Sequence, residues 1–124
     1  IRSQLYKLTW DATPASSTVK SAADDLDKKL IEIEDDLIQR KLTGQGQDNV
    51  RWPPKLLTKI NYLANGLSSG DFPPTKQQRE VQQLFKEQLS GLQKRLDGVL
   101  NKDLVVFNKL LSDNNIKTVI KPAL

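Results

Sequence analysis

Apolar residues recur at steps of three and four along residues 15–42, and charged or polar residues fill the positions between them. This spacing places the apolar side chains on one face of an α-helix. The positions are Val19, Ala23, Leu26, Leu30, Ile33 and Leu37. Thr13 and Pro14 suit the N-cap and the first helical position, and the glycines Gly44 and Gly46 suit the end of the helix. We therefore expect a first main helix over residues 15–42.

A second stripe of the same period follows two prolines. It comprises Leu56, Leu57, Ile60, Leu63, Ala64 and Leu67. Prolines are tolerated in the first turn of a helix, because the amides there lack partners within the helix. We expect a second helix over residues 53–67, ended by Gly66 or Gly70.

The third stripe is the longest. Thr75 and Gln78 match a capping box, in which each side chain accepts a hydrogen bond from the other residue's backbone amide. The apolar positions are Val81, Leu84, Phe85, Leu89, Leu92, Leu96, Val99, Leu100, Leu104, Phe107, Leu110 and Leu111. A third helix is expected over residues 75–112. Gly91 and Gly98 lie inside it, and they indicate either a close helix crossing, or local tolerance of glycine or a bend near residues 98–101.

The helix lengths predict how the elements are arranged. The first helix spans ~40 Å, and the second covers only about half of it. The half of the first helix that the second helix does not reach can be covered by Ile1, Leu5 and Leu8, which have helical spacing. Residues 1–9 are therefore interpreted as the end of a helix that begins further upstream. The tail, residues 113–124, contains a short stretch of residues with high β-propensity, which cannot form a sheet alone. The expected fold is all-α: one antiparallel up-down helical bundle over residues 1–124, with three main helices and a short N-terminal helical segment.

The composition excludes several classes of chemistry. The 124 residues contain no Cys, no His and no Met. Disulfides, thiolate nucleophiles, His-based triads and imidazole metal sites are therefore excluded. A translated chain begins with Met, so this chain is expected to be excised from a longer protein; a mature chain after signal-peptide removal is the alternative.

Many acidic residues lie between positions 24 and 36, and lysines are interleaved with them on the same helix face. General acid–base catalysis needs one carboxyl group with a pKa raised by desolvation, and nothing on this solvated face predicts one. We expect no catalytic residue, no metal ligand and no cofactor, and hence no enzyme. The formal net charge is +4. The basic residues of the chain are spread around the helices, and no aromatic residues are interleaved with them, so nucleic-acid binding is disfavoured.

Two motifs repeat an aromatic residue followed by two prolines, Trp52-Pro53-Pro54 and Phe72-Pro73-Pro74. In one interpretation each ring packs over the first turn of the next helix, like a hydrophobic staple. In the other, the rings dock on another domain, because aromatics are favoured interface anchors. Arg51 can stack on the Trp52 ring or pair with a carboxylate. Arg51, Trp52 and Phe72 are the candidate interaction surface.

Residues 51–111 resemble the C-terminal helical region of bacterial secreted β-propeller proteins, described as sortilin-like or BNR-repeat glycosyl-hydrolase-like. The stretches that carry the resemblance are Arg51-Trp52-Pro53-Pro54-Lys55-Leu56, Tyr62-Leu63, Gly66, Asp71-Phe72-Pro73-Pro74-Thr75-Lys76-Gln77-Gln78-Arg79-Glu80-Val81, Asp103-Leu104 and Phe107-Asn108-Lys109-Leu110-Leu111. The resemblance implies an appendage to a large propeller in an exported, extracytoplasmic protein, with any glycosidase chemistry in the propeller.

The expected function is that of a non-catalytic helical domain serving domain packing or protein interaction. Its partners would be other domains of the same parent protein or a separate protein. The alternative is a free-standing helical adaptor that binds an acidic protein or nucleic acid. No stretch approaches the ~20 apolar residues needed to cross a bilayer.

Overall fold

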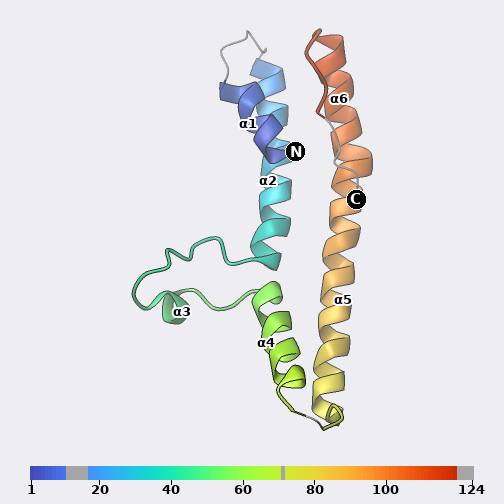
Figure 1. Ribbon diagram of the computed structural model, residues 1–124. Helices are drawn as coiled ribbons and strands as arrows, with labels where there is room; N and C mark the ends of the chain where they lie inside the picture. Colours follow the sequence, from blue (N-terminus) through green and yellow to red (C-terminus); the bar gives the residue numbers. More distant parts are fainter. Residues whose placement is uncertain (11–16, 71, 120–124) are drawn as a thin grey trace. The chain divides into compact units, whose positions relative to one another are not determined.

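The protein is all-α, as the sequence predicts. A computed structural model describes residues 1–10, 17–70 and 72–119, and within these ranges it contains helices and no strand. The helices are α1 (Arg2–Trp10), α2 (Ser17–Leu37), α3 (Asp48–Arg51), α4 (Leu56–Ser68), α5 (Lys76–Gly98), the π-helix η1 (Val99–Asp103) and α6 (Leu104–Asp113) (Figure 1).

The chain forms two compact units, whereas the sequence analysis expects one domain. The terminal unit comprises Ile1–Glu32 and Arg95–Leu124, and the central unit comprises Ile33–Lys94. Both boundaries fall inside a helix, the first within α2 and the second within α5.

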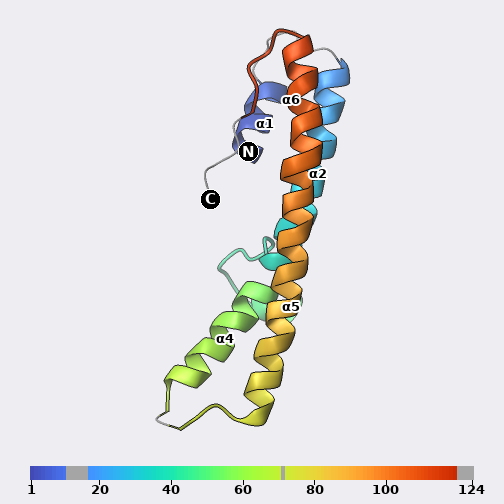
Figure 2. The ribbon, with the colours of Figure 1, turned by 90° about the vertical axis from the view of Figure 1, so that its right-hand side faces the viewer.

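The terminal unit contains three helical columns that alternate in direction: α1, α2 and the column that ends in α6 (Figures 1 and 2). Their facing sides supply the buried residues Leu5, Val19, Ala23, Leu26, Leu30, Val99, Leu100, Leu104, Phe107 and Leu111. Each lies on an apolar face identified from the sequence, and Leu5 covers the seam as expected. At the rim, the Lys29 ammonium lies 2.6 Å from the Asp103 carboxylate. This unit therefore has a dry core of its own.

The long third helix begins with the expected capping box. The Thr75 amide donates to the Gln78 side chain at 2.8 Å, and the Gln78 amide donates to the Thr75 hydroxyl at 3.2 Å. A Cβ added to Gly91 or Gly98 would meet nothing within 4 Å, so the close-crossing interpretation is wrong. The π turn η1 instead follows Gly98 directly. Such a turn adds one residue to the helical repeat.

The chain after α6 turns back along that helix. Asn115 has a φ of 56°, and the Ile116 amide donates to the Leu111 carbonyl at 2.9 Å, a Schellman-type helix end. The Asn108 side chain then makes two hydrogen bonds with the backbone of Val119, accepting at 2.8 Å and donating at 3.0 Å. Val119 is 4% exposed. The Asn108 side chain on α6 thus satisfies the backbone amide and carbonyl of Val119, as a neighbouring strand would in a sheet. Residues 120–124 lie outside the described residues.

Several predicted helix ends are wrong in the central unit. Helix α2 ends at Leu37 rather than at residue 42. Ile38 and Leu42 are 36% and 46% exposed, so their burial adds little to the stability of a longer helix. Gly44 and Gly46 have positive φ but belong to the following loop, and they do not cap α2. The expected start at residues 15–16, with its cap at residues 13–14, lies outside the described residues.

The next two helices also differ from expectation. The short helix α3 lies between the first and second expected helices, in a stretch where no helix is predicted. Helix α4 begins at Leu56 rather than at residue 53. A proline disfavours helical backbone in the residue before it, which applies to Trp52 and Pro53, and the N-cap residue Lys55 is extended, with φ −91° and ψ 179°. Gly66 is inside α4, which ends at Ser68.

Helices α4 and α5 form a hairpin within the central unit (Figure 2). Leu56 is buried in α4, whereas no residue of α5 is buried. Val81, Leu84 and Leu89 lie on the predicted apolar stripe but are 37%, 50% and 44% exposed. The predicted apolar stripe of the third helix is therefore only partly covered in this unit.

Candidate functional site

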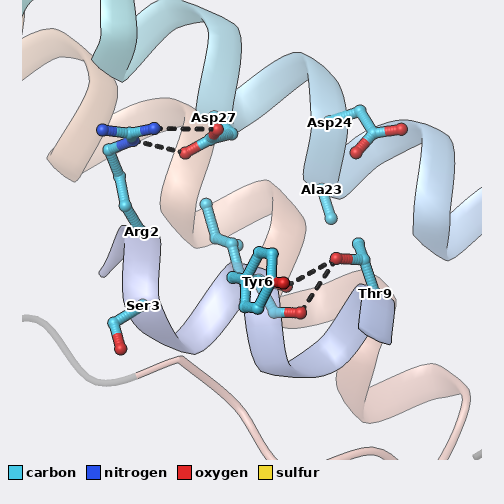
Figure 3. Close-up of a pocket in the computed structure, with 8 residues that line it drawn as sticks. Arg2, Ser3, Tyr6, Thr9, Ala23, Asp24 and Asp27 are labelled. Carbon is cyan, nitrogen blue, oxygen red and sulfur yellow. Dashed lines mark hydrogen bonds and ion pairs between the residues drawn. The ribbon is translucent and has the colours of Figure 1, made fainter. Parts of the chain in front are cut away.

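A polar pocket lies between α1 and α2 (Figure 3). The Arg2 guanidinium grips the Asp27 carboxylate with two hydrogen bonds, Nε to Oδ1 at 2.6 Å and Nη2 to Oδ2 at 3.3 Å. The Thr9 hydroxyl donates to the Tyr6 carbonyl at 3.0 Å. The pocket is lined by Arg2, Ser3, Leu5, Tyr6, Thr9, Ala23, Asp24 and Asp27.

Two polar side chains of this pocket, Arg2 and Asp27, pair with each other, and a third, Thr9, bonds to the backbone. A hydroxyl becomes a nucleophile when a neighbouring base accepts its proton, but the Thr9 hydroxyl donates to the backbone of its own helix. The Asp27 carboxylate is held by Arg2. The Arg2–Asp27 ion pair therefore joins α1 to α2, and the Thr9 hydroxyl and the Asp27 carboxylate are not paired with each other as nucleophile and base. Among residues 1–10, 17–70 and 72–119, no three His, Cys, Asp or Glu side chains gather as a metal site would require.

The predicted interaction residues Arg51 and Trp52 lie at the end of α3. Arg51 is exposed and Trp52 is half-buried. The cation over the Trp52 ring is Lys41, whose Nζ lies 4.5 Å from the ring centroid, and not the Arg51 guanidinium. The Gln39 side chain donates to the Pro53 carbonyl at 3.0 Å. This corner is thus fixed to the segment that follows α2.

Phe72 behaves differently. Its ring is 88% exposed, so it does not staple the first turn of α5. Trp52 precedes α4 and Phe72 follows it, and the 13 residues of α4 span ~20 Å. The two aromatic–proline corners therefore present two separate surfaces rather than one.

The loop before α3 is organised by the Asp48 carboxylate. It accepts hydrogen bonds from the Thr43 amide at 2.7 Å and from the Gly44 amide at 2.9 Å. The Thr43 hydroxyl donates to it as well, at 3.0 Å. Desolvation raises the pKa of Asp48, but hydrogen bonds from Thr43, Gly44 and Gln45 outweigh that effect, so the pKa is lowered. The carboxylate is therefore a structural element of this loop.

Two apolar grooves flank the seam of the α4–α5 hairpin, and the sequence analysis did not identify them as sites. The tyrosine groove is lined by Pro54, Thr58, Lys59, Tyr62, Leu63, Gln77, Gln78, Val81 and Phe85. The lysine groove is lined by Ile60, Leu63, Ala64, Leu67, Gln82, Phe85, Lys86 and Leu89. Leu63 and Phe85 belong to both grooves and mark the seam.

The two grooves open on opposite sides of the hairpin. Successive helical residues are rotated by about 100°, so residues two apart point in nearly opposite directions. Thr58 and Tyr62 line the tyrosine groove, whereas Ile60 and Ala64, two positions later, line the lysine groove. Tyr62 is 83% exposed. The hairpin therefore presents apolar surface on both of its sides.

Comparisons with known protein families, curated proteins and solved structures give no match. Within the described ranges, none of the helices is both long enough and apolar enough to span a membrane.

Proposed function

We propose that this chain is a non-catalytic helical domain that packs against another protein domain through its α4–α5 hairpin. The observation that carries the proposal is the open apolar seam of the hairpin. No residue of α5 is buried, and Leu89 is 44% exposed on the predicted core stripe.

The exposed apolar seam of the α4–α5 hairpin favours docking to another protein surface. A lone pair of short helices buries too little apolar surface to be very stable in water, because helices gain most of their stability from packing. Contiguous exposed apolar surface is typical of interaction sites. The terminal unit buries most of its own stripes, and its exposed large apolar side chains, Tyr6, Val105 and Val106, lie off those stripes. The hairpin is therefore the part of the chain with most to gain from a partner.

The resemblance of residues 51–111 supplies the proposed setting. It supports an appendage to a β-propeller in an exported protein, with the propeller as the docking domain and with any hydrolase chemistry belonging to it. Trp52 and Phe72 then frame the docked hairpin at the two ends of α4, with Arg51 as an adjacent charge. Aromatic and arginine side chains are the commonest interface anchors.

Site-specific photo-crosslinking tests this proposal. A photoreactive phenylalanine analogue replaces Tyr62 in the full-length protein that carries this chain, and the products are identified by mass spectrometry. We expect cross-links to a defined surface of the propeller. The matched control places the analogue at Val106, which is 70% exposed on α6 of the terminal unit. Cross-links of equal yield at both positions, or none from Tyr62, would contradict the proposal.

An adaptor for an acidic protein is the second candidate function. It is favoured by Arg79 and Lys86, which have no ion-pair partner among the residues that the structure describes. Nucleic acid fits less well, because base stacking requires aromatic platforms between the cations. Binding to DNA that weakens steeply with salt would instead support the nucleic-acid form of the adaptor.

A further inference from the structure

The lysine groove combines an apolar floor with a charged wall. Its floor is formed by Ile60, Leu63, Leu67, Phe85 and Leu89. Along α4 and along α5 the lining residues recur at steps of three and four, which is the spacing of the holes that receive side chains of a packed helix. Helices offer no free strand edge for an extended peptide. The shape of this groove therefore suits a third helix.

The wall of the groove on the α5 side is cationic. Lys86 lines the groove, and Arg79 precedes it by one heptad on the same side of α5. Both side chains are exposed and, within the described residues, lack an ion-pair partner.

The two acidic residues of α5 that lie near the lysine groove in sequence, Glu80 and Glu87, are engaged elsewhere. The Glu80 carboxylate lies 3.8 Å from the Lys76 ammonium, and the Glu87 carboxylate accepts a hydrogen bond from the side-chain amide of Gln83 at 2.9 Å. Residues 53–94 as a whole carry six Lys or Arg and three Asp or Glu. The charge facing an occupant of the lysine groove is therefore positive.

We propose that the lysine groove binds an acidic amphipathic helix of a partner protein. The apolar, leucine-rich face of that helix packs on the apolar floor of the groove. Acidic residues one heptad apart beside that face pair with Arg79 and Lys86. Charge complementarity of this kind selects partners and fixes their register. A second copy of this chain that met the first through the same groove would bring the same cationic wall, so symmetric self-association lacks the matching charge. This inference rests on the proposed docking role of the hairpin. It assigns a separate, helical partner to the lysine groove and leaves the tyrosine groove as the side proposed to face the propeller.

Two synthetic helical peptides test the proposal. Both carry leucines at helical spacing; one has glutamates on the flanking positions and the other has lysines. Fluorescence anisotropy with the whole chain is expected to show binding of the glutamate peptide, with at least tenfold weaker binding of the lysine peptide. Lys86→Glu is expected to weaken binding of the glutamate peptide about threefold to tenfold. Lys109→Glu makes the same charge change on α6 and is expected to leave binding unchanged.

The apolar floor is tested by Leu89→Gln, which changes a side chain that is already 44% exposed and so leaves the fold intact. We expect the loss of glutamate-peptide binding. Equal binding of both peptides, or binding of neither, would overturn the inference. So would a dimer in sedimentation that Leu89→Gln dissociates, or preferential binding of a DNA probe. If neither peptide binds but Tyr62 cross-links to the propeller, the acidic-helix inference fails while the proposed function stands.

Discussion

The most informative perturbation compares two leucines on one helical column. Leu89 and Leu100 are eleven residues apart, which is close to three helical turns, and both belong to the apolar stripe predicted from the sequence. Leu100 is 4% exposed in the terminal unit, and Leu89 is 44% exposed in the central unit. Truncating each to alanine therefore makes the same chemical change in a covered and in an uncovered part of the stripe.

The burial sets the expected magnitudes. Leu→Ala removes the equivalent of about three methylene-sized groups, at about 0.8 kcal/mol each when fully buried. A residual cavity adds to this loss in a packed core, so Leu100→Ala is expected to cost about 3 kcal/mol. Leu89 is only about half buried, and its groove is open to water, so no cavity forms. The expected loss for Leu89→Ala is about 1 kcal/mol.

Urea unfolding followed by far-ultraviolet circular dichroism measures both losses, and an unchanged m-value shows that the exposed surface on unfolding is unchanged. Separate transitions of the two units, if resolved, are fitted individually. The reasoning is refuted if both substitutions cost the same, or if Leu100→Ala costs less than Leu89→Ala.

Three further predictions follow from single contacts. Asn108→Ala removes both hydrogen bonds to the Val119 backbone; we expect a loss of about 1–3 kcal/mol in unfolding free energy and rapid amide exchange at Val119. Unchanged exchange there would contradict the role of Asn108. The pKa of Asp48 is lowered, so its hydrogen bonds stabilise the folded loop fully above the pKa of the unfolded carboxyl and are lost as the pH falls through the folded pKa. The exchange protection of the Thr43 amide should then decrease only below about pH 4, and Asp48→Asn should abolish that dependence. Thr75→Ala removes one half of the capping box and is expected to cost about 1 kcal/mol by urea unfolding, whereas Thr75→Ser should cost much less.

Helical periodicity predicted the core of the terminal unit well. Val19 and Leu26 on one helix, and Leu104 and Leu111 on another, are buried as their spacing indicates. The reason is that periodicity identifies the apolar face of a helix directly. The capping box at Thr75 was also readable, because its two side chains are local in sequence.

Periodicity does not say whether another element covers that face. Leu84 and Leu104 belong to the same stripe, yet one is 50% exposed and the other 2%. Helix α2 ends at Leu37, although Ile38 and Leu42 continue an apolar pattern, because the end depends on contacts that are distant in sequence. Gly98 marks the place where the π turn begins, but a single glycine does not distinguish a π turn from a bend.

The candidate site could be predicted only in part. Trp52 and Phe72 stand out from their repeated motif, and Phe72 is indeed highly exposed. The grooves were missed because their lining residues were assigned to a covered core. One signal was present in the sequence: Arg79 and Lys86 are one heptad apart beside the apolar stripe. Such a row becomes a recognition feature only when the neighbouring seam is open.

The central claim is that water reaches the apolar seam of the α4–α5 hairpin in this chain. Paramagnetic broadening of leucine methyl signals by a soluble relaxation agent measures this accessibility directly. We expect strong broadening at Leu84 and Leu89 and protection at Leu30 and Leu104, in line with their exposed and buried environments. Equal protection at all four methyl groups would contradict the account.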